Sequence, residues 1–291
     1  MVAGNDPGRP GSFERSLLAD LGRREAAWVL EDVGVGPGRP ATADQVRAVA
    51  ELSRRRVAGE PLQYVLGHWP FRHLDLLVDR RALIPRPETE WVTDVALAEL
   101  DRLVGDGRPA RVVDLGTGTG AIALSVATER AGFGVEVTGT DVEPDALDLA
   151  RSNQERLAAG HDGVGSVRWR QGSWWEALDP GERGTITLVV ANPPYVSAME
   201  WEVLDPVVRD YEPHRALVAE TGSDGTPAFA AVETILTGAP EWLSRPGAAV
   251  VEISPAQGAS ALWAAERLGA SGARVLSDLA GRPRALVARW G

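Results

Sequence analysis

The spacing of apolar residues changes near residue 110, and this change divides the chain into two parts. From residue 110 onward, short runs that are apolar at nearly every position alternate with longer stretches of helical spacing. Continuous apolar runs are typical of strands buried on both faces of a parallel sheet. We expect strands at residues 111–115, 135–140, 167–171, 185–191, 248–253, 274–278 and 285–289, and helices at 121–130, 144–159, 229–236 and 259–268. This alternation predicts an α/β fold with a mostly parallel sheet and helices on both of its faces.

The first part of the chain has helical spacing between residues 12 and 60, where Thr42 or Asp44 can cap a helix that runs to about Val57. Strand-like runs at 69–71, 74–78 and 82–84 predict a β-hairpin connector. Two prolines followed by acidic residues predict a helix from about Glu88. We therefore expect a small N-terminal helical domain that docks the substrate, then a connector with the first helix, then the main domain, at residues 1–77, 78–109 and 110–291.

Composition narrows the functional classes. The 291 residues include no cysteine, which excludes disulfides, zinc–thiolate sites and cysteine catalysis. The net charge of −11 argues against a broad electrostatic grip on nucleic acid. Residues 1–77 are neutral, with ten basic and ten acidic residues, and their basic run at 54–56 is interpreted as a solvated helix face. Neither a membrane span nor the apolar core of a signal peptide is present, so a cytoplasmic enzyme is expected. The histidines are scattered, and we expect no metal site.

A glycine-rich turn joins the first strand of the main domain to its helix. Gly116, Gly118 and Gly120 allow a tight turn and close approach of the backbone to a ligand. The same stretch fits the dinucleotide fingerprint, which makes an NAD enzyme the rival interpretation. Asp114 argues against it, because a carboxylate there disfavours a pyrophosphate and suits the ammonium and sulfonium charges of S-adenosylmethionine. Asp141 ends the next strand and can accept from both ribose hydroxyls of either ligand.

Two further turns carry candidate binding residues. Trp174 and Trp175 follow the third strand, where an aromatic ring can stack on an adenine. The sequence Asn-Pro-Pro-Tyr at residues 192–195 follows a buried strand directly, at the end where ligands bind in open α/β sheets. The prolines rigidify this turn and remove two N–H donors. The Asn192 side-chain oxygen and the Pro193 carbonyl can then both accept from a substrate NH2 group, with Tyr195 against its plane.

Such a pair of acceptors suits the methylation of an amide nitrogen. That nitrogen is a poor nucleophile because its lone pair is delocalised into the carbonyl. Acceptors that hold its hydrogens out of the flat geometry favour attack on a methyl group and stabilise the cationic nitrogen that forms. The extra proton can leave afterwards, so no strong general base is required.

The motif at residues 192–195 resembles the signature of methyltransferases that act on planar NH2 groups. The chain as a whole resembles the release-factor glutamine N5-methyltransferase family, of the PrmC/HemK type, through the matching segments 59–67, 83–90, 116–124, 211–213, 216–217 and 278–282. This resemblance implies a class I S-adenosylmethionine-dependent methyltransferase fold, Rossmann-like with a mostly parallel seven-stranded sheet. It also implies methylation of N5 of the glutamine in the Gly-Gly-Gln motif of class 1 peptide-chain release factors, which affects translation termination.

The resemblance also implies roles for individual residues. The catalytic residues would be Asn192, Pro193 and Tyr195. The cofactor residues would be Asp114, Gly116, Thr117, Gly118, Thr119, Gly120, Asp141, Trp174 and Asn192. The substrate residues would be Asn192, Pro193, Pro194, Tyr195, Arg86 and Glu88. One departure is Ser173, which stands where relatives often have an aspartate associated with the adenine amine.

Three other functions stay open at this point. A nucleic-acid adenine N6-methyltransferase shares the acceptor motif, but it should carry a basic groove that this acidic chain lacks. A glutamine methyltransferase for a ribosomal protein is disfavoured by the stretch 84–90, and a catalytically idle adaptor is disfavoured by the intact acceptor motif. We expect a monomeric enzyme that makes no direct contact with nucleic acid or membrane.

Overall fold

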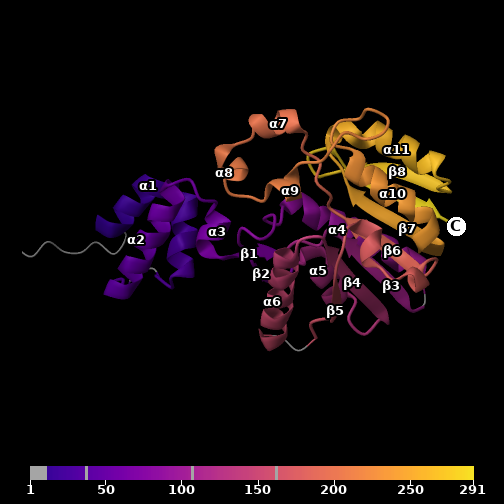
Figure 1. Ribbon diagram of the computed structural model, residues 1–291. Helices are drawn as coiled ribbons and strands as arrows, with labels where there is room; N and C mark the ends of the chain where they lie inside the picture. The colour runs from indigo at the N-terminus through magenta and orange to yellow at the C-terminus, as the bar shows by residue number, and fades with distance from the viewer. Residues whose placement is uncertain (1–11, 37–38, 106–107, 161–162) are drawn as a thin grey trace, which may run out of the picture. The chain divides into compact units, whose positions relative to one another are not determined.

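The computed structural model describes residues 12–36, 39–105, 108–160 and 163–291 (Figure 1). The chain divides into two compact units. The smaller unit comprises the described residues up to His68 together with Asp205–Tyr211, and the larger comprises Trp69–Leu204 and Glu212–Gly291. Within the described ranges, no helix is both long enough and apolar enough to cross a membrane.

The smaller unit consists of short helices around a small apolar core. Its elements are α1 (Ser12–Asp32), α2 (Ala43–Val57), α3 (Leu62–Leu66) and α8 (Pro206–Arg209). The predicted start of α2 is confirmed, because Thr42 and Gln45 form a capping box in which each side chain accepts from the other's backbone N–H. The core residues of these helices are Ala26, Val29, Val49 and Leu62.

The basic run on α2 is engaged in ion pairs within this unit. Arg55 pairs with Glu60 at 2.7 Å, and Arg56 pairs with Glu25 at 2.8 Å. Arg54 pairs with Glu51 on the same helix. These three arginines are therefore neutralised locally and do not form a free basic patch.

The larger unit is built on a seven-stranded sheet, which confirms the predicted class. Its strands lie in the order β5-β4-β3-β6-β7-β9-β8, and β9 runs antiparallel to both of its neighbours. Their bounds are β3 (Ala110–Leu115), β4 (Val135–Asp141), β5 (Val167–Gln171), β6 (Ile186–Ala191), β7 (Leu243–Glu252), β8 (Gly272–Ser277) and β9 (Pro283–Trp290). A separate two-stranded sheet contains β1 (His68–Phe71) and β2 (Leu74–Leu77).

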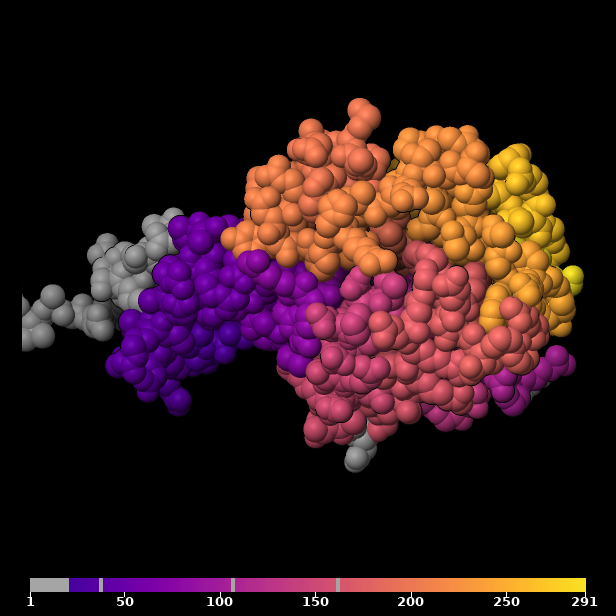
Figure 2. All heavy atoms as spheres, in the orientation of Figure 1, coloured from indigo at the N-terminus to yellow at the C-terminus, as the bar shows by residue number. Residues whose placement is uncertain are grey.

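Helices cover both faces of this sheet, so the central strands are apolar on both sides. On β6, Leu188 and Val190 pack in one core and Val189 and Ala191 in the other. The first core is closed by α4 (Pro87–Val104), α5 (Ala121–Glu129) and the end of α6 (Pro144–Gly160). The second is closed by α10 (Ala230–Trp242) and α11 (Gly258–Arg267) (Figure 1). Figure 2 shows the outer face of these layers with all of their side chains drawn.

Several elements differ from the sequence-based expectation. The run 82–84 is not a strand, because the Ile84 N–H donates to the Glu212 carboxylate at 3.1 Å instead of to a neighbouring strand. Short helices that no apolar period predicted are α7 (Ala198–Glu202), α9 (His214–Leu217), η1 (Trp174–Ala177), η2 (Pro180–Glu182) and η3 (Pro255–Gln257). The predicted helix at about Glu88 is confirmed as α4, with Pro87 in its first turn.

Candidate active site

Strand register brings the predicted site residues to one edge of the sheet. Leu115 at the end of β3 is opposite Thr140 on one side and Ala191 on the other. Ala191 is in turn opposite Val251 of β7. The next residues along these four strands are Asp141, Gly116, Asn192 and Glu252, and they therefore emerge side by side. The strand order changes direction at β3, with β4 on one side and β6 on the other. Open α/β sheets bind ligands at such a switch point.

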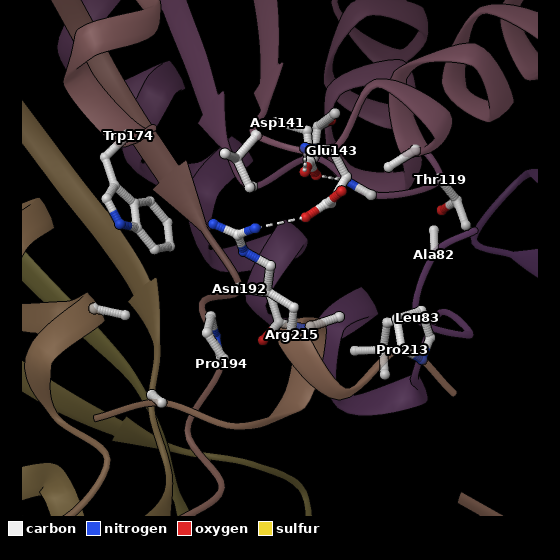
Figure 3. Close-up of a pocket in the computed structure, with 18 of the residues that line it drawn as sticks. Ala82, Leu83, Thr119, Asp141, Glu143, Trp174, Asn192, Pro194, Pro213 and Arg215 are labelled. Atoms are coloured by element: carbon white, nitrogen blue, oxygen red, sulfur yellow. Dashed lines mark hydrogen bonds and ion pairs between the residues drawn. The ribbon is translucent and has the colours of Figure 1, made fainter. Parts of the chain in front are cut away.

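A cavity of about 480 Å3 opens at this edge of the sheet (Figure 3). Its volume is in the range of sites for small-molecule ligands. The predicted site residues that line it are Gly116, Thr117, Gly118, Thr119, Asp141, Trp174, Asn192 and Pro194. The predicted residues outside its lining are Asp114, Gly120, Pro193, Tyr195, Arg86 and Glu88. The glycine loop and the acceptor motif thus share one cavity.

The glycine loop is held by the carboxylate at the end of the next strand. Asp141 Oδ2 accepts from the Gly118 N–H at 2.9 Å, and its Oδ1 accepts from the Glu143 N–H at 3.0 Å. Gly116 and Gly118 have φ angles of 76° and 55°, a region that favours glycine. Burial raises the pKa of Asp141 above its ordinary value. Its oxygens lie at the cavity wall, where they can accept from the hydroxyls of a ligand.

Asp114 lies buried beneath this loop and does not contact the cavity. Its Oδ2 accepts from the Thr117 hydroxyl at 2.6 Å and from the Ala123 N–H at 3.2 Å. Its Oδ1 is buried and has no hydrogen-bond partner in the described chain. Burial, partly offset by these bonds, raises the pKa of Asp114 to about 7. Asp114 was expected to bind the cofactor, but it is buried outside the cavity lining and can act on a ligand only through the loop or through its charge when ionised.

The two adjacent tryptophans take different roles. Trp174 lines the cavity with φ at 48°, and a Cβ added at Gly116 would lie 3.5 Å from its ring. Trp175 is a core residue instead: it stacks on Trp242 with ring centroids 5.8 Å apart, and its Nε1 donates to the Ile235 carbonyl at 3.1 Å. Of these two described tryptophans, Trp174 alone lines the cavity. Ser173, the noted departure, also lines the cavity.

Side-chain hydrogen bonds connect the acceptor motif to two residues, Thr89 and Glu252, that the sequence analysis did not identify. Asn192 Nδ2 donates to the Thr89 hydroxyl at 3.1 Å, and that hydroxyl donates to Glu252 at 2.8 Å. The Tyr195 hydroxyl donates to the other oxygen of Glu252 at 3.3 Å. Burial and the neighbouring Glu252 charge raise the pKa of Tyr195 well above its usual value. One signal was available for Glu252: it is an acidic residue that ends an apolar strand on the ligand-binding edge.

Two further ion pairs frame the site. Arg215 Nη1 and Glu143 Oε1 are 2.9 Å apart, and both residues line the cavity (Figure 3). Arg86 pairs with the buried Glu212, which also binds the Ile84 N–H and so fixes the cavity wall at 81–85. Neither Glu143 nor Arg215 has a local sequence signature, because their pairing spans 72 positions.

Arg86 and Glu88, expected on the substrate side, are both paired with other side chains. Glu88 lies 3.2 Å from Arg282 in a partly exposed ion pair. No group of three or more histidine, aspartate or glutamate side chains suited to a metal ion occurs among the described residues.

Family models match two parts of this chain. Residues 15–67 match the PrmC N-terminal domain, and residues 93–210 match the methyltransferase small domain. A release factor glutamine methyltransferase of Salmonella typhimurium is 36% identical, and the match covers 94% of each chain. The enzyme of that name from Agrobacterium fabrum is 35% identical over 94% of this chain and 89% of its own.

Solved structures with low identity share the fold. A methyltransferase from Pyrococcus furiosus superposes with a TM-score of 0.52 at 16% identity, covering 85% of this chain and 98% of its own. The human methyltransferase 10 domain containing protein gives a TM-score of 0.50 at 15% identity, covering 74% and 87%. Both similarities concern the methyltransferase fold alone.

Proposed function

The chain belongs to the release factor glutamine methyltransferase family, and from this premise we propose that it methylates the side-chain amide nitrogen, N5, of a glutamine in a peptide-chain release factor. The observation that carries the proposal is that Asn192 and Pro194 line the same cavity as the glycine loop. A methyl donor bound by the glycine loop and an amide bound by the acceptor motif would thus lie in the same cavity.

S-adenosylmethionine is the cofactor, and when bound it supplies an electrophilic methyl group on a sulfonium. The residues at the cavity fit it in three ways. Behind the cavity, the partnerless oxygen of Asp114 would provide a negative field for its charged end when the carboxyl is ionised. Asp141 offers acceptors for ribose hydroxyls, and the ring of Trp174 offers a face for the adenine.

The acceptor motif would orient the glutamine amide. The Asn192 Oδ1 and the Pro193 carbonyl are assigned as the two acceptors for its NH2 group, and Tyr195 supports the loop that presents them through its bond to Glu252. Removal of one pre-placed group of this kind typically costs about 10²–10³ in turnover. Asn192→Ala should therefore lose turnover on that order, and its affinity for the cofactor should fall much less.

The finer substrate assignment rests on the family resemblance. We infer that the glutamine is that of the Gly-Gly-Gln motif in class 1 release factors, and that the N-terminal domain at residues 1–77 helps to dock the folded factor. The neutral charge of this domain and the net charge of −11 support a protein substrate without direct nucleic-acid contact.

A transfer assay with labelled S-adenosylmethionine tests the proposal. Wild-type enzyme should label a class 1 release factor and should not label the same factor with its Gly-Gly-Gln glutamine replaced by alanine. Adenine-containing DNA and ribosomal proteins serve as competing acceptors. Label in DNA or in a ribosomal protein, with none in the release factor, would contradict the proposed substrate.

A further inference from the structure

A buried chain of hydrogen bonds connects the acceptor motif to the neighbouring strand. Glu252 at the end of β7 is 0% exposed, and Thr89 in the first turn of α4 is 4% exposed. The carboxylate binds the Thr89 hydroxyl through Oε2 and the Tyr195 hydroxyl through Oε1. Thr89 in turn contacts Asn192. Among the described residues, Thr89 and Asn192 line the cavity and Glu252 does not.

The chemistry of these groups determines which atom donates at each of these hydrogen bonds. An ionised carboxylate can only accept, so the single hydroxyl proton of Thr89 must be donated to Glu252. That hydroxyl can then only accept at its contact with Asn192, so the Asn192 group that faces it must be the NH2. The other end of the same amide, Oδ1, is therefore the end left for a substrate.

We propose that Glu252 is a positioning residue that fixes the polarity of the Asn192 amide, so that its oxygen faces the substrate NH2 group. This inference rests on the proposed function. An amide turned by half a rotation would present its own NH2 to the NH2 of the substrate, and two donors cannot bond to each other. The carboxylate acts through Thr89 and does not itself contact the reacting atoms.

The protonation state of Glu252 determines whether Thr89 donates to Glu252 and accepts from Asn192. A protonated carboxyl can donate, and Thr89 is then free to donate to the Asn192 oxygen instead. Burial raises the pKa of Glu252 to about 7, against the opposing effects of Thr89, Arg284 on β9 and Tyr195, while Glu88 on α4 adds to the increase. The carboxylate form exists above that pKa, so turnover should rise with pH through about 7.

A purely structural role for Glu252 makes different predictions. The Thr89 contact also ties α4 to β7, so loss of the carboxylate could act through stability alone. Such a loss would lower stability and both binding affinities together. A positioning role lowers turnover far more than it lowers stability or the affinities for S-adenosylmethionine and for the release factor.

Five full-length variants, one of them a double variant, separate the two roles. Glu252→Gln is nearly isosteric but supplies a donor, and Thr89→Val removes the hydroxyl at constant shape. Each should reduce turnover, up to roughly 10²-fold, because misorientation of a catalytic group has effects of that size. Thr89→Ser keeps the hydroxyl and should restore turnover to within about threefold of wild type. In an Asn192→Ala background, Glu252→Gln should have almost no further effect, because its target is already absent.

Two readouts do not depend on turnover. Calorimetric affinities for cofactor and release factor should stay within about threefold of wild type in Glu252→Gln. The NMR signal of the Asn192 side-chain NH2, identified by its loss in Asn192→Ala, should shift in Glu252→Gln and Thr89→Val and stay in place in Thr89→Ser.

The outcomes distinguish the inference from the proposed function. Wild-type turnover on the release factor with an unchanged rate in Thr89→Val would overturn the inference and leave the function standing. Additive losses in the Glu252→Gln, Asn192→Ala double variant would also overturn it. Absence of wild-type turnover would count against the proposed function, and the NMR comparison would then still decide whether Glu252 sets the orientation of Asn192.

Discussion

Asp141 accepts from the Gly118 N–H of the glycine loop and also lines the cavity. Two variants are therefore needed to separate these two roles. Asp141→Ala should weaken S-adenosylmethionine binding by about 1.5–3 kcal/mol, the usual size for hydrogen bonds to a charged group. Asp141→Asn keeps one acceptor and should lose less. Asp145→Ala, at an exposed position in the first turn of α6, is the matched control. Calorimetry of the folded variants is the measurement, and unchanged affinity in Asp141→Ala would remove the assignment.

Asp114 should make the stability of the cofactor-free enzyme depend on pH. Its folded pKa is raised from 3.8 to about 7, so between these values the folded protein keeps a proton that the unfolded chain releases. The free energy of unfolding therefore falls as pH rises across this range. The shift corresponds to at most on the order of 4 kcal/mol above pH 7.

Asp114→Asn should remove this pH-dependent cost. Urea unfolding at about pH 8 should show the variant to be more stable than wild type, and its advantage should shrink by more than half at about pH 5. Glu252 titrates in the same range in both proteins, so its contribution cancels. An advantage that does not change with pH would mean that Asp114 keeps an ordinary pKa.

On strand β4, tight packing requires a glycine at position 139, although this residue belongs to no recognised motif. A Cβ at Gly139 would lie 2.4 Å from the ring of Trp169, which also covers Gly120. Gly139→Ala should therefore lower the free energy of unfolding by about 1–3 kcal/mol, as overpacked cores do. Gly160→Ala, where no atom lies within 4 Å, is the control and should be close to neutral. Equal denaturant midpoints for the two variants would show that the Trp169 ring moves aside freely.

Long, strongly patterned elements were predictable from the sequence, and short ones were not. Strand β6 is apolar at nearly every position because both of its faces are buried, and that pattern is visible without a structure. Helices α7 and α8 have five and four residues. Capping by Ser197 and Asp205, and not an apolar period, marks where they begin.

The same division applies to the candidate site. Residues within local motifs, such as Gly116 and Asn192, were identified because the motif itself carries the chemistry. Thr89 and Glu252 were missed because they lie 103 and about 60 positions from Asn192, and only strand register and helix packing bring them together. Long-range hydrogen bonds of this kind leave no periodic signal in the sequence.

The two units of the molecule should separate substrate docking from cofactor binding. Phe71, Leu74 and Leu76 of the hairpin are buried in the core of the larger unit, so a deletion that tests docking should end at residue 67. It should lower kcat/KM for an intact release factor about tenfold or more, which is about 1.4 kcal/mol. Cofactor affinity should stay within about threefold, because the glycine loop and Asp141 lie outside the deletion.

A short Gly-Gly-Gln peptide is the internal control for this deletion. It should be a poor substrate for both forms and should respond little to the deletion, because it has no folded surface to dock. A folded truncated enzyme that methylates the intact factor as well as the full chain does would assign residues 1–67 to another role.

The chemical position of the new methyl group tests the central claim most directly. A class 1 release factor is incubated with the wild-type enzyme and S-adenosylmethionine, digested, and analysed by tandem mass spectrometry. We predict one added methyl group, located on the side-chain amide of the Gly-Gly-Gln glutamine and formed about 10²–10³-fold more slowly when Asn192→Ala replaces the wild type. A methyl group on any other residue, or an unmodified factor in the presence of enzyme that binds the cofactor, would contradict this account.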